Sequence, residues 1–490
     1  PRWNMAETDQ LTQAVLRKHP QYQRMEKIYR FFEESYKGGS EYVGAKNLFK
    51  HTFEDQEGFT ERKERAYYYN YCAPIVNVYN SFIYRQKIQR DYGALADDEL
   101  FQLFLDDADK QGNSYDEMVR NSSNWASVTG IRYWLIDKPE EKADTKKDEI
   151  ENELYPYIVH LSPLDVLDWG LDKYGRLLWV KVREGTGDSE DFKAETEEVE
   201  RYRVWYREKW ELYEIHKEAN ERKAVLKDEG EHPVGEVPIV QVVHFSEQSM
   251  TGGSLLNDIA YVNRGIYNWC SLLDEILYRQ TFSQLVMPED PKSPINDQAL
   301  GTARGLGFPP DARHAPHFIS PDASQAQVLM DQIERAVEEI YRLATLSGAS
   351  GVEKDASGVS KAYDFTITNN TLSSKAINMA DAETRALKIW AKWQGIDDPG
   401  ISIEYPREFD VIALSEEIEN LIKIQTLNIS KKFESIIKNR IVGRMAPRLS
   451  EEDRKQIEAE IEQSASNTQQ SRFGNQTDQI FGQTGTEGGE

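Results

Sequence analysis

The chain of 490 residues has few cysteines and no long apolar run, and each shortage excludes a class of protein. Its two cysteines, Cys72 and Cys270, cannot build a disulfide framework, and neither belongs to a C-x-x-C pair. We therefore expect two buried thiols in a protein made in a reducing compartment. No apolar run approaches the 18 residues of a membrane span, and the N-terminus lacks the apolar core of a secretory signal. The sequence predicts neither a membrane protein nor a secreted one.

Basic residues are also scarce relative to acidic ones. The chain has 59 Lys and Arg against 84 Asp and Glu, which gives a net charge of −25. Non-specific DNA binding depends on Lys and Arg displacing counterions, so this balance argues against a DNA-binding module as the main activity. Only 39% of residues are hydrophobic, while 11% are aromatic. The composition predicts an ordered protein with a large surface for its size. Such a protein is elongated, has several lobes or encloses another molecule.

The first half of the chain changes from a helical to a strand period. Helical spacing of apolar residues is clearest at Pro74–Tyr84 and recurs near Glu99–Asp109 and Ser114–Val128. The period is two between Ile131 and Phe245, which predicts an α+β module in a predominantly helical protein. The acidic stretches Glu140–Glu151 and Asp188–Glu200 are expected to be solvated loops. The predicted strands are Ile131–Ile136, Tyr155–Leu161, Leu177–Val182, Tyr202–Tyr206, Trp210–Ile215 and Val237–Phe245.

Two long helices flank an irregular insert in the second half. Ser254 is a candidate N-cap for a helix that runs to about Gln280. The Pro- and Gly-rich stretch Pro288–Pro316 cannot form a regular helix. A second helix is marked by Ser320 as N-cap and Pro321 at its first position.

Small residues follow the second helix and precede a third. The stretch Ser347–Gly351 predicts a mobile loop, and a third helix is expected over Val359–Trp393. A short strand at Ile401–Tyr405 and a charged helical block at Ser415–Gln463 come next. From Ser464 the chain lacks apolar anchors, which predicts disorder.

No catalytic motif is found. The chain has no P-loop, dinucleotide fingerprint, nucleophile elbow or HExxH sequence, so we expect no enzyme, cofactor or metal. Three features leave alternatives open. His314 and His317 suit either a metal or ordinary loop positions. Asp168–Asp172 suits a strand turn better than a calcium loop, and Tyr67–Tyr71 suits core or subunit packing better than base stacking.

Three segments, taken in this order of elements, resemble the portal proteins of tailed bacteriophages. The sequence from Asn70-Tyr71-Cys72-Ala73-Pro74-Ile75-Val76 to Lys87 is similar to the N-terminal helix motif of that family. Leu161–Trp169 resembles the strand and turn of its wing domain. Ser357–Phe365 resembles the segment after its tunnel loop. The likeness covers roughly residues 8–463, and none of its motifs is catalytic.

The resemblance implies a fold and named parts. The implied parts are an N-terminal wing at 1–253, a first stem helix at 254–280, a clip at 281–320, a second stem helix at 321–346, a tunnel loop at 347–358, a tunnel and wing helix with a strand at 359–411, helical crown segments at 412–463 and a disordered tail at 464–490. Residues implied to face DNA in the tunnel loop are Ser347, Gly348, Ala349, Ser350, Gly351, Val352, Glu353 and Lys354. Clip residues implied to dock partners are Pro288, Pro291, Pro294, Arg304, Arg313 and His314.

The family's role is that of a structural ring, and the resemblance implies the same here. Such a protein forms a homo-dodecamer at one capsid vertex of the virion, after synthesis in the bacterial cytoplasm, and double-stranded DNA passes through its channel during packaging and ejection. Its implied partners are the large terminase subunit, head-completion or adaptor proteins, and the major capsid and scaffolding proteins. Lys354 is the best candidate for a phosphate contact, against a solvated loop lysine. The alternatives are another structural phage head or neck protein and a metal-dependent hydrolase using scattered carboxylates.

Overall fold

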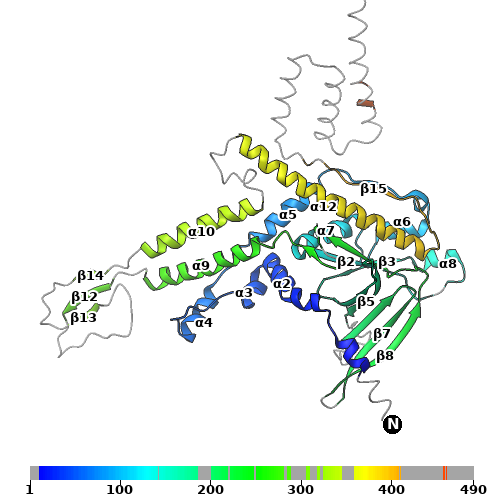
Figure 1. The fold of residues 1–490 in the computed structure, drawn as a ribbon. Coiled ribbons are helices and arrows are strands. Elements are labelled where there is room, and N and C mark those ends of the chain that lie inside the picture. Colours follow the sequence, from blue (N-terminus) through cyan, green and yellow to red (C-terminus); the bar gives the residue numbers. More distant parts are fainter. Residues whose placement is uncertain are drawn as a thin grey trace, which may run out of the picture. The chain divides into compact units, whose positions relative to one another are not determined.

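The computed structural model describes residues 10–141, 143–185, 200–218, 221–247, 250–280, 284–288, 305–308, 317–319, 324–344, 358–407, 409, 456–457 and 460. The chain divides into two compact units, residues 1–409 and residues 410–490. All helices and strands named below belong to the first unit (Figure 1).

Several helices of the first unit begin at a polar side chain that caps them. The side chains of Asp55, Asp98, Ser114 and Thr145 accept hydrogen bonds from backbone N–H groups in the first turns of four helices. Residues 10–16 are also helical. The helices are α2 (Pro20–Lys37), α3 (Gly39–Gly44), α4 (Gln56–Arg65), α5 (Cys72–Ile83), the short 3-10 helix η1 (Gly93–Leu95), α6 (Glu99–Asp106), α7 (Tyr115–Thr129), α8 (Lys146–Glu151), α9 (Ile259–Gln280), α10 (Ser324–Leu343) and α12 (Gly358–Trp393).

The strands form one large antiparallel sheet and several small ones. The five-stranded sheet has the order β4-β5-β6-β7-β8, and a three-stranded sheet has the order β3-β2-β9. The short strands β1 and β15 pair with each other, as do β10 and β11. The strands are β1 (Gln89–Asp91), β2 (Ile131–Asp137), β3 (Tyr157–Leu161), β4 (Val166–Leu171), β5 (Leu177–Glu184), β6 (Glu200–Tyr206), β7 (Lys209–Glu218), β8 (Glu221–Glu231), β9 (Ile239–Val243), β10 (Phe245–Ser246), β11 (Gly252–Gly253), β12 (Gln284–Pro288), β13 (Gly305–Phe308), β14 (His317–Ile319) and β15 (Ser402–Glu404).

Strand β2 separates two hydrophobic cores. Because side chains alternate along a strand, Tyr133 and Leu135 face the core beneath the five-stranded sheet, whereas Trp134 and Ile136 face the helical core. The helical core collects side chains from α5, α6, α7, α9, α10 and α12. The long helix α12 packs on β9 and β2, so it covers the three-stranded sheet (Figure 1).

Most predicted elements are confirmed. The expected helices at Pro74–Tyr84, Ser114–Val128 and Val359–Trp393 correspond to α5, α7 and α12, and the strand at Ile401–Tyr405 corresponds to β15. All six predicted strand runs carry strands, and Asp168 lies in β4 with a turn at Asp172, as the strand-turn interpretation required. Both cysteines are free and buried, as expected. The first unit is α+β.

Two sequence predictions are wrong. Glu140–Glu151 is not all loop, because Thr145 caps the exposed helix α8. Ser254 does not cap the first long helix, which begins five residues later at Ile259. The Ser254 hydroxyl instead donates to the carbonyl of Val128 at 2.6 Å and accepts from the N–H of Leu256, so it ties the turn before α9 to the end of α7.

Glycines allow that turn to approach α7 closely. Gly130 ends α7 with φ at 88°, and a Cβ added there would lie 2.2 Å from the carbonyl oxygen of Gly252. Only a glycine fits both the left-handed backbone and the contact. The contact fixes the strand pair β10–β11 against α7, and α9 starts from this position.

Candidate assembly surface on the α9–α10 helix pair

The insert between the two long helices contains a small sheet. Strand β12 pairs in parallel with β13 and antiparallel with β14, and it begins four residues after α9 ends. Helices α9 and α10 pack against each other (Figure 1). The described part therefore agrees with the predicted order of helix, irregular insert and helix. The predicted start of the second helix at Ser320 and Pro321 lies outside the described residues, and α10 is described from Ser324.

A buried asparagine fastens the inner part of α9 to the N-terminal helices. Asn263 is fully buried, and its Oδ1 accepts from the Tyr68 hydroxyl at 2.8 Å and from the Tyr71 N–H at 3.1 Å. Its Nδ2 donates to the carbonyl of Tyr69 at 2.9 Å. The side chain thus pairs with the backbone of an extended segment much as a neighbouring strand would. This contact fixes where α9 leaves the rest of the unit.

Further polar side chains of α9 form hydrogen bonds to the N-terminal part of the chain. Asn268 accepts from the N–H of Phe49 at 2.8 Å and donates to the carbonyl of Asn47 at 3.0 Å. Arg62 of α4 donates to the Ser271 hydroxyl of α9 at 2.9 Å. Two positions of α9, Asn268 and Ser271, therefore carry polar contacts to the segment that contains α4.

Arg62 is itself held by an ion pair. Its side chain is 2% exposed and contacts the Glu54 carboxylate at 2.7 and 2.8 Å. Hydrogen bonds from Arg62 lower the pKa of Glu54 against the opposing effect of burial. A second pair joins Arg65 to Glu275 of α9. The ionised carboxylates help to fix α4 against α9.

The aromatic run Tyr67–Tyr71 packs against the same helix. Tyr68 stacks on Tyr42 with ring centroids 3.7 Å apart, and its hydroxyl contacts Asn263. Tyr71 meets Tyr341 of α10 edge to face. The structure therefore places this run in packing between elements, as the packing interpretation expected. Tyr67 and Tyr69 remain about half exposed.

Helix α10 is covered far less than α9. Its buried residues are Ala336 and Ile340, and both lie in its second half. In the first half, the side chains of Val328 and Met330 are 67% and 52% exposed. Positions two residues apart are separated by about 200° around the axis of a helix. The side chains of Val328 and Met330 therefore project from different flanks of α10. Single exposed apolar side chains are common on protein surfaces, whereas several that gather in one region mark contacts with other proteins.

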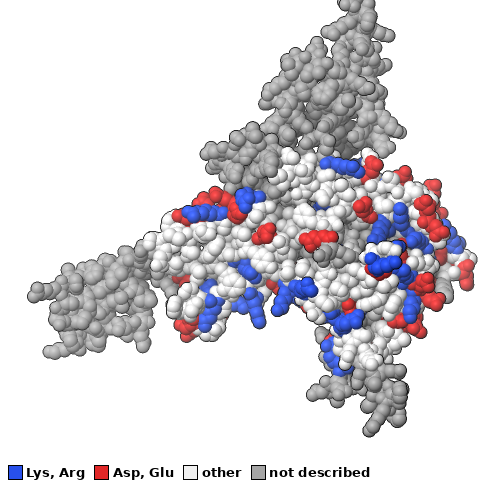
Figure 2. Space-filling model, viewed as in Figure 1, with Lys and Arg blue, Asp and Glu red and all other residues white. Residues whose placement is uncertain are grey.

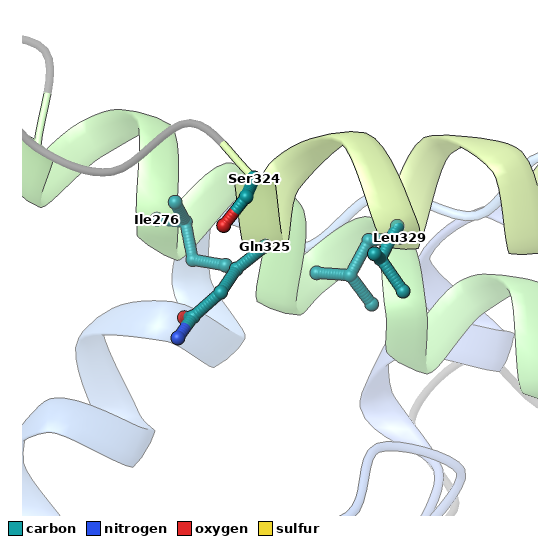
Figure 3. Close-up of a pocket in the computed structure, with 5 residues that line it drawn as sticks. Ile276, Ser324, Gln325 and Leu329 are labelled. Atoms are coloured by element: carbon teal, nitrogen blue, oxygen red, sulfur yellow. The ribbon is translucent and has the colours of Figure 1, made fainter.

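A shallow hollow lies between the outer parts of the two helices (Figure 3). It has a volume of about 330 Å³ and is lined by Ile276 of α9 and by Ser324, Gln325, Val328 and Leu329 of α10. Leu277 and Tyr278, which follow Ile276 in the sequence of α9, are 52% and 63% exposed. Figure 2 shows a largely uncharged surface over this part of the helix pair. The hollow is open and apolar, which suits a side chain of another protein better than a small charged ligand.

The predicted site residues mostly lie outside the described part of the chain. Of the proposed clip residues, only Pro288 is described, and it ends β12. Pro291, Pro294, Arg304, Arg313 and His314 lie outside the described residues, as do Ser347, Gly348, Ala349, Ser350, Gly351, Val352, Glu353 and Lys354. Gly358, predicted as the end of the tunnel loop, is the first residue of α12.

Neither a metal cluster nor a membrane span is found where the structure is described. Within the described ranges, no group of three His, Cys, Asp or Glu side chains is placed to hold a metal ion. His317 lies in β14, whereas its neighbour His314 is not described. None of the helices over the same residues has the length and apolar content needed to cross a bilayer.

Sequence reasoning missed the polar residues that fasten α9. It described the helix by its apolar face, although Asn263 lies on that face at helical spacing between Ile259 and Ile266. A buried amide within an apolar stripe signals a specific partner, because its desolvation must be compensated. The sequence carries that signal, but it does not show that the partners of Asn268 and Asn263 lie at residues 47–49 and 68–71.

Comparison with known proteins finds one weak structural likeness and no sequence relative. No protein-family model matches the chain, and no curated protein matches it. Among solved structures, it is similar to a chain of a structure described as "Virion of native gene transfer agent (GTA) particle". The TM-score is 0.39 and the identity 10%, over 74% of this chain and 88% of the other. A likeness this weak determines neither fold nor function.

Proposed function

We propose that the chain is a structural virion protein, a portal-type subunit that assembles with copies of itself into a closed ring. The observation that carries the proposal is the α9–α10 pair, with exposed apolar side chains on two flanks of α10. In a ring made by head-to-tail contacts, each subunit meets one neighbour on each side through different surfaces. Val328 on one flank and Met330 on the other supply one apolar position toward each neighbour.

The parts of the proposed ring follow the portal resemblance. The insert 281–320 would dock the large terminase subunit during packaging, and head-completion or adaptor proteins afterwards. The loop 347–358 would face double-stranded DNA, with Lys354 nearest to a phosphate. Scaffolding and major capsid proteins would surround the ring at one capsid vertex. The chain would act as a channel without catalysis and without a cofactor, and the net charge of −25 would keep it from holding the DNA tightly.

The assembled mass of the purified full chain tests this proposal. Native mass measurement and end-on images of negatively stained particles are expected to show large closed rings, twelve-fold in the virion. A stable monomer at every salt concentration would overturn the proposal. Rings without a projecting stem would instead indicate another structural phage component.

Shortening the loop tests the proposed contact with DNA. Deleting residues 349–356 is expected to leave rings intact and to reduce DNA packaging into capsids. Deleting a segment of equal length from 464–490 is the control. Normal DNA filling by the loop variant would refute the assignment of 347–358 to the channel, while ring formation itself would stand.

A further inference from the structure

Two phenylalanines project from the surface just before α4. Phe53 is 92% exposed and Phe49 is 57% exposed, although a phenylalanine ring gains free energy by leaving water. The backbone that carries them is held in place. The N–H of Phe49 donates to Asn268 at 2.8 Å, and its carbonyl accepts from Arg62 at 2.9 Å. The N–H of Phe53 donates to Nδ1 of His51 at 3.3 Å. The fold therefore presents both rings to the outside on a fixed backbone.

An arginine of α9 lies beside Phe49. The guanidinium of Arg264 is 5.3 Å from the ring centroid of Phe49 and 5.1 Å from that of Tyr261. It is also 4.5 Å from the ring centroid of the buried Phe31. Among the described residues, its side chain has neither an ion pair nor a hydrogen-bond acceptor. Three rings hold the guanidinium in place, while its N–H groups stay available to an acceptor that the described residues do not supply.

The segment that carries the two phenylalanines is basic. Residues 45–53 contain two exposed lysines and no acidic residue, in a chain whose net charge is −25. Aromatic residues and arginine are the types enriched where proteins bind one another. We call this region the basic aromatic surface, and its members are Phe49, Lys50, Phe53 and Arg264.

The hollow between α9 and α10 has the complementary character (Figure 3). Its lining has three apolar and two uncharged polar side chains. Along α10, residues 324–334 include two exposed carboxylates, Asp331 and Glu334, and no basic residue. Asp331 follows Val328 of the hollow by three residues, so it lies about one turn along the helix and about 60° around its axis. An aromatic ring that enters the hollow would therefore bring its neighbouring cations toward these carboxylates.

The basic aromatic surface and the hollow lie on different faces of α9. Ser271 and Glu275 of α9 contact α4, whereas Ile276 lines the hollow. Ile276 follows Glu275 by one residue and therefore points about 100° away around the helix axis. Figure 1 shows α4 and α10 on opposite sides of α9. The basic aromatic surface is thus turned away from the hollow of its own copy, as a head-to-tail contact between two copies requires.

We propose that the Phe53 ring of one copy enters the hollow between α9 and α10 of the next copy. Lys50 and Arg264 then face the acidic residues Asp331 and Glu334 of that copy. The inference rests on the proposed ring and names the two surfaces through which neighbouring copies meet. Because the surfaces differ, each copy turns one of them toward each neighbour, and the contact repeats until the ring closes.

Cross-linking between copies of the full chain tests the contact. The variant with both Phe53→Cys and Gln325→Cys is treated with a short bis-maleimide at a concentration at which it assembles. We expect a ladder of linked subunits up to the size of the particle. Each single variant should give no linked subunits, because the two surfaces differ, and a mixture of the two single variants should give dimers only. Wild type is the control for Cys72 and Cys270, which are buried.

The outcomes separate this contact from the ring itself. If wild type stays monomeric at every salt concentration, the ring is refuted and the contact with it. If the double variant forms particles of wild-type mass without a ladder, the contact is refuted and the ring stands. Linked subunits from Phe53→Cys alone would also refute the contact, because they would place two copies of the same surface together.

Truncating the ring of Phe53 tests how much it contributes. Phe53→Ser is expected to raise the subunit concentration needed for assembly about tenfold, because the ring would be buried in the contact. The variant subunit should unfold at the same denaturant concentration as wild type, since this side chain is almost fully exposed. Tyr174→Ser is the matched control, because Tyr174 is 69% exposed but lies in the turn between β4 and β5. Equal assembly concentrations for the two variants would overturn the proposed contact.

Discussion

Helices α9 and α10 are neighbours of nearly equal length, 22 and 20 residues, yet they are held in opposite ways. Asn263, Asn268 and Ser271 of α9 are buried or half-buried, and each is hydrogen-bonded to the N-terminal segments. The outer half of α10 has no buried residue. Directional hydrogen bonds determine the position of one helix, while the outer half of the other leaves Val328 and Met330 more than half exposed. The comparison separates residues that specify the fold from residues that the fold leaves uncovered.

Removing the hydrogen bonds that Asn263 makes from α9 should have the largest effect on the free energy of unfolding. Asn263→Ala leaves the Tyr71 N–H and the Tyr69 carbonyl without their partner, while the Tyr68 hydroxyl keeps the carbonyl of Ser35 at 3.1 Å. Since each unsatisfied buried group costs about 1–3 kcal/mol, we expect the free energy of unfolding to fall by about 3 kcal/mol. Denaturant unfolding of the isolated subunit measures it.

Asn257 provides the matched control. It is exposed in the turn before α9, so Asn257→Ala should change the free energy of unfolding by less than about 0.5 kcal/mol. Equal stabilities of the two variants would show that hydrogen bonds from Asn263 do not hold α9.

Neutralising Glu54 should have a smaller, pH-dependent effect. Glu54→Gln weakens the contact to Arg62, and a hydrogen bond to a charged group contributes about 1.5–3 kcal/mol, so we expect a loss of about 2 kcal/mol at pH 7. The folded pKa of Glu54 is lowered, so its contribution is complete above the unfolded value of 4.5 and is lost as pH falls through the folded value.

Measuring the free energy of unfolding of wild type and Glu54→Gln from pH 7 down to pH 3 checks both the size of the loss and the direction in which it changes with pH. The difference between wild type and Glu54→Gln should shrink below pH 4.5. Glu57→Gln, at an exposed position of α4, should match wild type throughout. A difference that grows on acidification would contradict the ion pair as its source.

Elements with a strong local signal could be predicted from the sequence. Helix α7 has Ser114 as its cap and an apolar stripe, and β2 is a short run of mostly apolar residues that is buried on both faces. Strand β8 could not be predicted, because its sequence Glu221–Glu231 is mostly charged and only its pairing with β7 makes it a strand. Helix α8 was missed for a similar reason, since it buries no residue and depends on its Thr145 cap.

The candidate site was predictable in outline only. Two long helices around an insert follow from periodicity and from the Pro- and Gly-rich stretch between them. Which face of each helix is covered depends on segments far away in the sequence, as between Asn263 and Tyr71, which are 192 residues apart. Lys375 carried a readable signal, because it falls at helical spacing between the buried residues Leu372 and Met379. A lysine in such a stripe predicts a buried amine, but its hydrogen-bond partners on α5 and α7 come only from the fold.

The smallest effect on folding is expected on the outer half of α10. Val328→Asp places a charge on a side chain that is already 67% exposed, so the free energy of unfolding of the subunit should change by less than about 0.5 kcal/mol. The same substitution should prevent ring assembly, because a carboxylate buried between subunits loses its water without a partner. Native mass measurement of the variant checks this. Gln327→Glu, exposed on the same turn but about 100° around the helix from Val328, should assemble as wild type does. If Val328→Asp forms the same particles as Gln327→Glu, this flank of α10 faces solvent in the ring, and the uncovered surface does not serve assembly.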